Sequence, residues 1–405
     1  MTSTTRDPGT LASLDLFTDD VLADPYPWYR TLRDLGPAVR LPGHDVWAVP
    51  RHADVQAVLR DTDTFRSKDG VALTDMANQV ILDGTVLGSD GEDHRRLRRV
   101  LAEQLRPASI RALTTEVHRR ADRLVAGLVT RGSFDAAGDL ARGFVADVVM
   151  ELMGLPLDTR DELIDNAAAT FEMFGPANQR YQVAAPAAAA MIDFLSQRVT
   201  RTSVRPDSWM ASVYDAVDAG RLDESEVVPL MSAYTVAGMD TTINGITNAV
   251  HLLATHPRQW GHLRGRRATG REAFHEAIRY DAPVQGFGRR VGSDTAIDGT
   301  EIPAGDQVWV LYGSAGRDHR RWGASADQFD VLRPDAAEHL ALGAGPHACA
   351  GNHLAALQAG AVLDALATHC TRLELAGEPT RALNNVLRGW AHLPVRVVPD
   401  RRRRR

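Results

Sequence analysis

The chain has 405 residues, a formal charge of −6 and 44% hydrophobic residues, which is typical of a globular protein large enough to bury a substantial core. The mildly acidic balance gives no reason to expect a nucleic-acid partner, and no stretch of about 18 uncharged apolar residues predicts a membrane span. The chain has only two cysteines, Cys349 and Cys370, so a disulfide framework is excluded and a reducing compartment is favoured.

No internal repeat, linker or shift in composition marks a domain boundary, so we expect one domain over residues 1–400. The arginines at 401–405 form a basic tail that we expect to be disordered. The N-terminus lacks a basic segment followed by an apolar one, so no signal peptide is predicted and a cytoplasmic location is expected.

Apolar residues at spacings of three and four predict helices along most of the chain. We expect them over residues 93–105, 114–129, 144–153, 185–199, 226–255 and 351–368. The stretch 226–255 is largely apolar all round, which indicates one helix of about 45 Å through the middle of the molecule. Pro257 ends it, because proline disfavours a helical residue before it.

Strand signals are fewer. Short β-branched runs predict strands at 46–49, 307–311 and 395–398, and turn residues predict a hairpin at 297–305. The fold class is therefore expected to be mainly α with a minor β region, and Rossmann and TIM-barrel architectures are disfavoured because strands and helices do not alternate.

A glycine-rich loop, LGAGPHACAG at 342–351, holds Cys349 just before a predicted helix. The thiol could be structural, a nucleophile with His347 or His353 as its base, or a thiolate metal ligand, which a helix N-terminus favours. Zinc and iron–sulfur sites lack ligands, because no second cysteine lies nearby. The chemistry of these residues alone leaves the three alternatives open.

Two further segments combine acids with other polar groups. AGMDTT at 237–242 lies midway along the central predicted helix, where a buried acid is costly unless it has a function, and threonine can bend a helix. EAIR at 276–279 places Glu276 and Arg279 on one helix face, where they can form an ion pair. Taken alone, this is weak evidence for a functional site, because surface pairs of this kind are common.

Together these segments resemble the cytochrome P450 superfamily. LGAGPHACAG is similar to its haem-binding loop, with Leu342 in place of the usual phenylalanine, and AGMDTT and EAIR resemble its oxygen-activation and Glu-x-x-Arg motifs. The motifs occur in the family's order across nearly the whole chain. The resemblance implies the cytochrome P450 fold, with a long central helix over the haem, and a bacterial, soluble haem-thiolate monooxygenase.

The resemblance also implies the residues of the cofactor site. Cys349 is the expected iron ligand of haem b (iron protoporphyrin IX), whose thiolate favours O–O cleavage. Propionate partners and other haem contacts are expected at His94, Arg98, Arg289, His347, Ala237, Leu342 and Gly343, with Arg290 as the alternative to Arg289. Asp240 and Thr241 are the expected catalytic residues, for proton delivery and for steadying oxygen and water. Gln328 stands where the family commonly adds an arginine to the Glu-x-x-Arg pair, and Arg333 is the expected substitute.

Family positions predict an apolar substrate pocket. Its expected residues, besides the loop 71–87, are Phe171, Phe174, Ala233, Val236, Val284, Gln285, Phe287 and Val386. FEMFGPANQR and RALNNVLRGW are similar to a bacterial subgroup that oxidises small aromatic ethers and acids. O-dealkylation of such a compound and hydroxylation of a terpenoid or secondary metabolite both remain open.

No GxGxxG fingerprint lies in the chain, so the two electrons are expected from a ferredoxin and a ferredoxin reductase. The basic flank formed by Arg95, Arg96, Arg99 and Arg106 is the expected docking surface for an acidic donor. The alternatives to O2-dependent oxidation of a small hydrophobic molecule are a non-catalytic haem-binding protein, a peroxide-using or oxidative-coupling variant, and a cysteine hydrolase without haem.

Overall fold

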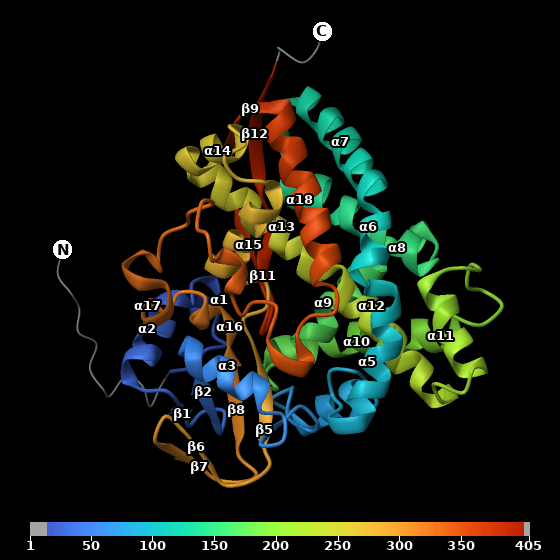
Figure 1. Cartoon of the computed structure of the whole chain (residues 1–405), viewed down its shortest axis with the longest axis vertical. Coiled ribbons are helices and arrows are strands. Elements are labelled where there is room, and N and C mark those ends of the chain that lie inside the picture. Colours follow the sequence, from blue (N-terminus) through green and yellow to red (C-terminus); the bar gives the residue numbers. More distant parts are fainter. Residues whose placement is uncertain (1–13, 401–405) are drawn as a thin grey trace.

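Two consecutive helices, α12 (Val227–Gly238) and α13 (Asp240–Thr255), run through the middle of the molecule (Figure 1). The structure is a computed structural model that describes residues 14–400, so the predicted tail at 401–405 lies outside it. Nearly every residue of α13 is buried, which explains why the sequence there is apolar all round. The helix ends at His256, before Pro257, as predicted.

The prediction of a single helix over 226–255 is wrong at its centre. Met239, with φ −108° and ψ −66°, separates α12 from α13. The Thr241 hydroxyl donates to the carbonyl oxygen of Ala237 at 2.9 Å. In a regular α-helix the Ala237 carbonyl would accept from the backbone N–H of Thr241. A side-chain hydroxyl that bonds to the same carbonyl competes with that bond, and such competition bends or opens a helix.

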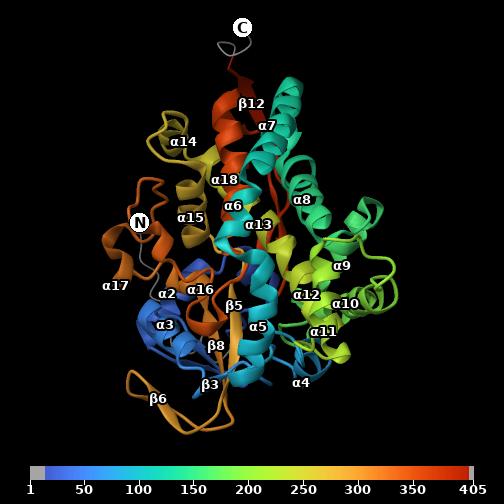
Figure 2. The same ribbon diagram turned by 45° about the vertical axis from the view of Figure 1, so that its right-hand side comes forward.

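Other helices surround this pair, and α18 (Asn352–His369) packs between α7 (Thr114–Arg131) and α15 (Gly270–Tyr280) (Figures 1 and 2). The remaining helices are α1 (Asp19–Ala23), α2 (Tyr26–Leu35), α3 (His52–Arg60), α4 (Asp75–Ala77), α5 (Gly91–Leu105), α6 (Pro107–Ala112), α8 (Gly143–Met153), α9 (Arg160–Glu172), α10 (Gln179–Gln197), α11 (Trp209–Asp218), α14 (Pro257–Arg264), α16 (Tyr312–Ala315) and α17 (His319–Trp322). Short turns of tighter or wider helix include η2 (Asn78–Leu82), η3 (Ala136–Arg142) and η8 (Gly345–His347).

The predicted helices at 93–105, 114–129, 144–153 and 351–368 agree with α5, α7, α8 and α18 to within two residues at each end. Helix α10 begins six residues before the predicted 185. Its start is fixed by Asn178, whose side-chain oxygen accepts from the Tyr181 amide at 3.1 Å, a capping bond that apolar spacing does not reveal.

The β region is small. One sheet has the order β1 (Val39–Leu41), β2 (Val46–Val49), β8 (Gln307–Leu311), β5 (Gly286–Val291) and β3 (Phe65–Arg66). Strand β8 pairs parallel to β2 and antiparallel to β5, and all five of its residues are buried. The second sheet has the order β4 (Ser133–Asp135), β12 (Pro394–Pro399) and β9 (Cys370–Leu375).

Two separate hairpins complete the β region: β10 (Thr380–Leu383) pairs with β11 (Arg388–His392), and β6 (Thr295–Ile297) pairs with β7 (Thr300–Ile302). The predicted strands 46–49 and 307–311 are β2 and β8, and 395–398 lies within β12. The predicted hairpin at 297–305 is β6–β7, which turns at Asp298 and Gly299 with φ of 43° and 84°.

Buried apolar side chains from the helices and the sheets form one continuous core. Within residues 14–400, no helix is both long and apolar enough to span a bilayer.

An ion pair lies inside this core on α15. Glu276 and Arg279 are both fully buried, and Arg279 Nε donates to the Glu276 carboxylate at 2.6 Å. Arg279 also donates to backbone carbonyls, including that of Gln328 at 2.9 Å. Arg333 Nε lies 3.3 Å from the same carboxylate, so the prediction that Arg333 replaces the arginine missing at 328 is confirmed.

We predict that Glu276→Gln lowers the free energy of unfolding by roughly 3–5 kcal/mol, because it leaves Arg279 as an uncompensated buried charge. Denaturant unfolding measures this. Glu92→Gln is the matched control, since Glu92 and Arg95 pair with the same spacing on α5 but are exposed and should contribute little. Equal effects of the two substitutions would contradict the burial argument.

Candidate active site

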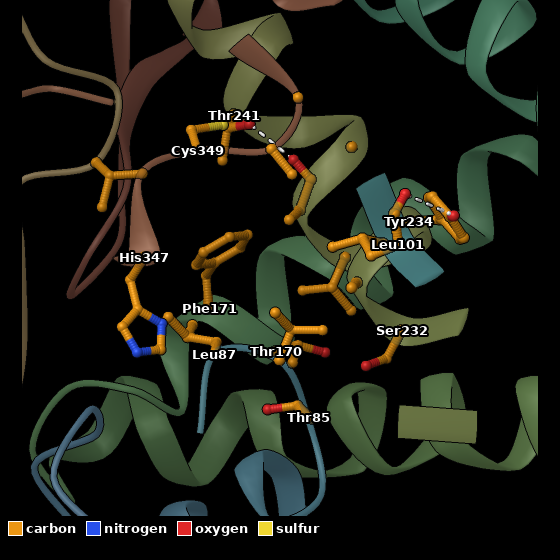
Figure 3. A pocket seen from close by; sticks show the side chains of 18 of the residues that line it. Thr85, Leu87, Leu101, Thr170, Phe171, Ser232, Tyr234, Thr241, His347 and Cys349 are labelled. Carbon is orange, nitrogen blue, oxygen red and sulfur yellow. Dashed lines mark hydrogen bonds between the residues drawn. The ribbon is translucent and has the colours of Figure 1, made fainter. Parts of the chain in front are cut away.

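A cavity of about 400 Å³ lies beside the break between α12 and α13. Its lining comes from the segment 80–87, from α5, α9, α10, α12 and β5, and from the loop and helix around Cys349. Cys349 and Thr241 lie at one end of this cavity in Figure 3, and Thr85, Thr170 and Ser232 lie toward the other.

The Cys349 loop aims its sulfur into the cavity, where it is accessible. Burial raises the pKa of the thiol, while hydrogen bonds from the Gly351 and Asn352 amides and the nearby Arg98 charge lower it. Gly345 has φ of 68°, and a Cβ there would lie 2.5 Å from the Leu59 carbonyl oxygen, so the loop can approach α3 only with glycine. The effect of burial is the larger, so the pKa of the thiol stays above its ordinary value. The sulfur nevertheless has room on the cavity side and donors that would stabilise a thiolate once a cation faces it.

Cationic and imidazole groups gather beside this loop. Arg98 donates to the Ala348 carbonyl oxygen, and Arg289 is 2% exposed and lines the cavity. The rings of His94 and His347 lie with their centroids 4.1 Å apart. Burial lowers the pKa of both imidazoles, that of His94 to about 4, so both are neutral near pH 7.

The Nε2 atoms of His94 and His347 are buried without a hydrogen-bond partner among the described residues. Asp90 Oδ1 is 3.5 Å from His347 Nε2, too long for a good bond. Buried polar atoms without partners are costly. Together with Arg98 and Arg289 they fit the two carboxylates of a haem, and the accessible Cys349 sulfur fits its iron, so the residues present suit that cofactor.

Thr241 faces the cavity from the first turn of α13, while Asp240 does not line it. The Asp240 side chain is 8% exposed, and the Asn244 amide lies 3.4 Å from it. Burial raises the pKa of Asp240 to about 7, although the Arg142 charge opposes this shift. Asp240 can therefore hold or release a proton near neutral pH.

Most of the predicted site residues lie together around the cavity. Those that line it are Cys349, Arg98, Arg289, His347, Ala237, Leu342, Gly343, Thr241, Phe171, Phe174, Ala233, Val236, Val284 and Phe287. His94 lies just behind, against His347.

Two predicted substrate residues lie elsewhere. Gln285 turns its amide nitrogen to the Ala282 carbonyl at 2.6 Å and its oxygen toward Gly313. Val386 is fully buried, and its carbonyl oxygen accepts from the backbone N–H of Gln285. Neither lines the cavity, and the two segments pair with each other through their backbones.

Thr170 and Ser232 are among the polar residues of the lining that the sequence analysis missed. Ser232 could have been found from helical spacing, since it lies four residues before the predicted pocket residue Val236 on the same face of α12. Thr170 directly precedes the predicted Phe171 on α9.

Comparison with known proteins identifies the family. The family model Cytochrome P450 matches residues 271–381, which include the Glu276–Arg279 pair and the Cys349 loop. Cytochrome p450 CYP199A2 of Rhodopseudomonas palustris is 36% identical over 389 residues, which cover 95% of this chain and 94% of that protein. Cytochrome P450 monooxygenase PikC of Streptomyces venezuelae is 32% identical, with 97% of this chain and 95% of that protein covered.

Solved structures agree with this relationship. CalO2 superposes with a TM-score of 0.83 at 29% identity, covering 95% of this chain and 99% of that one. Cytochrome P450 CREJ, in complex with (4-ethylphenyl) dihydrogen phosphate, superposes with a TM-score of 0.87 at 24% identity, covering 96% of this chain and 100% of that one. This match supports the fold alone. The predicted mainly α fold is confirmed. With its thiol loop, its broken central helix and these relatives, the chain belongs to the cytochrome P450 family, for which haem is the implied cofactor.

Proposed function

We propose that this cytochrome P450 monooxygenase uses O2 and two electrons from separate proteins to hydroxylate or O-dealkylate a small hydrophobic substrate. The observation that carries the proposal is that the Cys349 sulfur and Thr241 lie at one end of a mostly apolar cavity, and that the buried Asp240 directly precedes Thr241 in the chain. When bound, the haem supplies the redox chemistry that activates O2, and a thiolate ligand favours O–O cleavage.

The roles of the residues follow from their positions. Cys349 is the iron ligand, and His94, Arg98, Arg289 and His347 hold the propionates. Ala237, Leu342 and Gly343, which line the same cavity, would contact the haem. The substrate packs against Phe171, Phe174, Ala233, Val236, Val284 and Phe287, which present apolar surface to the same space.

Asp240 and Thr241 act in proton delivery. The Thr241 hydroxyl donates to the Ala237 carbonyl, so it presents lone pairs to the cavity and can hold a water there. Asp240 is the adjacent residue, and its pKa of about 7 leaves a large share of the carboxyl protonated under physiological conditions. A protonated acid beside a water-holding hydroxyl provides general acid catalysis.

We further propose that residues 1–400 form one domain and that the protein works in the cytoplasm. The continuous core supports the first statement. The two free cysteines support the second, because disulfides are rare in reducing compartments.

A pH series tests the proton roles. Because folding raises the pKa of Asp240 to about 7, the carboxyl is protonated below that pH and ionised above it, so product formed per electron pair should fall as the pH rises from about 6 to about 8. Asp240→Asn should lower this coupling and abolish its pH dependence. Thr241→Val should lower it at least about tenfold while the pH dependence remains.

Thr247→Val is the control for this series, since the Thr247 hydroxyl donates to the Asn244 carbonyl at 3.0 Å within α13 and does not line the cavity. Wild-type coupling that is constant over this range, together with normal coupling in Asp240→Asn, would exclude the assigned role.

The electron donor is proposed to be an acidic ferredoxin, reduced by its reductase, that docks on the basic flank of α5. Arg95 pairs with Glu92, and Arg96 forms a bidentate pair with Glu226. Arg99 and Arg106 are exposed, and neither forms an ion pair within the described chain. These two arginines therefore supply most of the uncompensated charge of the flank.

We predict that replacing Arg99 and Arg106 with glutamine raises the KM for an acidic ferredoxin about tenfold at low salt and weakens its salt dependence. Steady-state reduction at several ionic strengths measures both. Arg372→Gln, an exposed arginine on β9, is the control. Donor kinetics that do not respond to salt would contradict electrostatic docking.

A further inference from the structure

The hydroxyls at the end of the cavity away from Cys349 (Figure 3) have their protons engaged. Thr170 Oγ1 donates to the Asn166 carbonyl at 2.8 Å, and Ser232 Oγ donates to the Pro229 carbonyl at 2.7 Å. Each oxygen keeps lone pairs for a further bond. Thr170 and Ser232 therefore offer acceptors, rather than donors, to a molecule in the cavity.

Thr85 contributes less to this group. Its hydroxyl donates to the Leu82 carbonyl at 2.6 Å and also accepts from the Gly88 amide at 3.0 Å. The loop that carries Thr85 thus uses its proton and one of its two lone pairs, so Thr170 and Ser232 have more accepting capacity left for a ligand.

The charges of the cavity lie elsewhere. Arg98 bonds to the Cys349 loop at Ala348, and Arg289 is close enough to His347 to lower its pKa. No other arginine or lysine occurs among the described residues of the lining, and its exposed acid is Asp83. An anion beside Thr170 and Ser232 would thus be buried without a counter-charge, which is strongly unfavourable.

Aromatic rings occupy the space between the two ends. The Phe171 ring projects between Cys349 and the hydroxyls in Figure 3. It stacks at 9° to the Phe287 ring, with centroids 6.4 Å apart, and meets Phe174 edge-on at 5.5 Å. Such a wall offers both a ring face and ring edges, which suit a flat aromatic group.

The two ends of the cavity are separated along α12. Ser232 precedes Ala237, whose carbonyl accepts from the Thr241 hydroxyl, by five residues of this helix, which is about 7.5 Å along the axis at the rise of an α-helix.

We infer that the substrate is a neutral, aromatic molecule that carries a hydroxyl or N–H donor at the end remote from the oxidised group. The donor binds the oxygen of Thr170 or Ser232. This inference rests on the proposed function, and it favours a phenol-like or alcohol-like compound over an aromatic acid.

Three biphenyls of equal length test it. Each carries a para-methoxy group on one ring, and the other ring carries a para-hydroxyl, para-methoxy or para-carboxylate group. Their dissociation constants are measured on the haem-loaded protein by spin-state shift and by equilibrium dialysis. The hydroxyl compound should bind at least about fivefold more tightly than the dimethoxy compound and at least about thirtyfold more tightly than the carboxylate.

The double variant Thr170→Val/Ser232→Ala should weaken binding of the hydroxyl compound to the level of the dimethoxy compound, whose own affinity should not change. Thr235→Val is the matched control. The Thr235 hydroxyl also donates within α12, to the Met231 carbonyl at 3.2 Å, but it does not line the cavity.

Equal binding of the three compounds, tightest binding of the carboxylate, or binding of none of them overturns the inference. A double variant that keeps the preference for the hydroxyl compound overturns the assignment of its partners. These failures leave a pigmented protein with an intact haem spectrum, whereas failure of the proposed function gives a protein that does not retain haem or does not oxidise any bound compound.

Discussion

The position of one sulfur atom constrains the rest of the site. Burial alone disfavours a charged Cys349, and the amides of Gly351 and Asn352 and the Arg98 guanidinium act against that penalty. A thiolate in such a place needs a cation directly in front of it, and the cavity leaves that space open. The loop can hold the sulfur there because Gly345 has a positive φ and lies against the backbone of α3.

The surrounding groups complement a flat dianionic cofactor on one side and a neutral apolar molecule on the other. His94 and His347 each have a buried ring nitrogen that the described residues leave without a hydrogen-bond partner, a state that is costly unless a ligand completes it. Above them, the break at Met239 removes a regular helical turn beside the cavity and leaves Thr241 bonded to Ala237. The core that encloses the Glu276–Arg279 pair also supports the Cys349 loop.

Local patterns in the sequence predicted the elements whose signal is local. Val46–Val49 and Gln307–Leu311 are β-branched runs between turn residues, and both are strands with those limits. The break in the central helix could not be predicted from apolar spacing, because a side-chain bond from Thr241 leaves the periodicity unchanged. Most of the candidate site came from the family resemblance, residue by residue, and not from periodicity.

Errors in the pocket arose where contacts are distant in sequence. Gln285 and Val386 pair through their backbones, and neither lines the cavity. The contact between Arg333 and Glu276 spans 57 residues, and the resemblance could only suggest it. Thr170 and Ser232 carry polar side chains on apolar helix faces, and their orientation depends on carbonyls one turn earlier.

The most direct test compares the absorption spectrum of the reduced, carbon monoxide-treated protein with that of Cys349→Ser, with Cys370→Ser as the control because that thiol is buried in β9. The account predicts the thiolate signature in the wild type and the control, and its loss in Cys349→Ser. A wild-type protein that takes up no haem, or a signature that survives in Cys349→Ser, would contradict it.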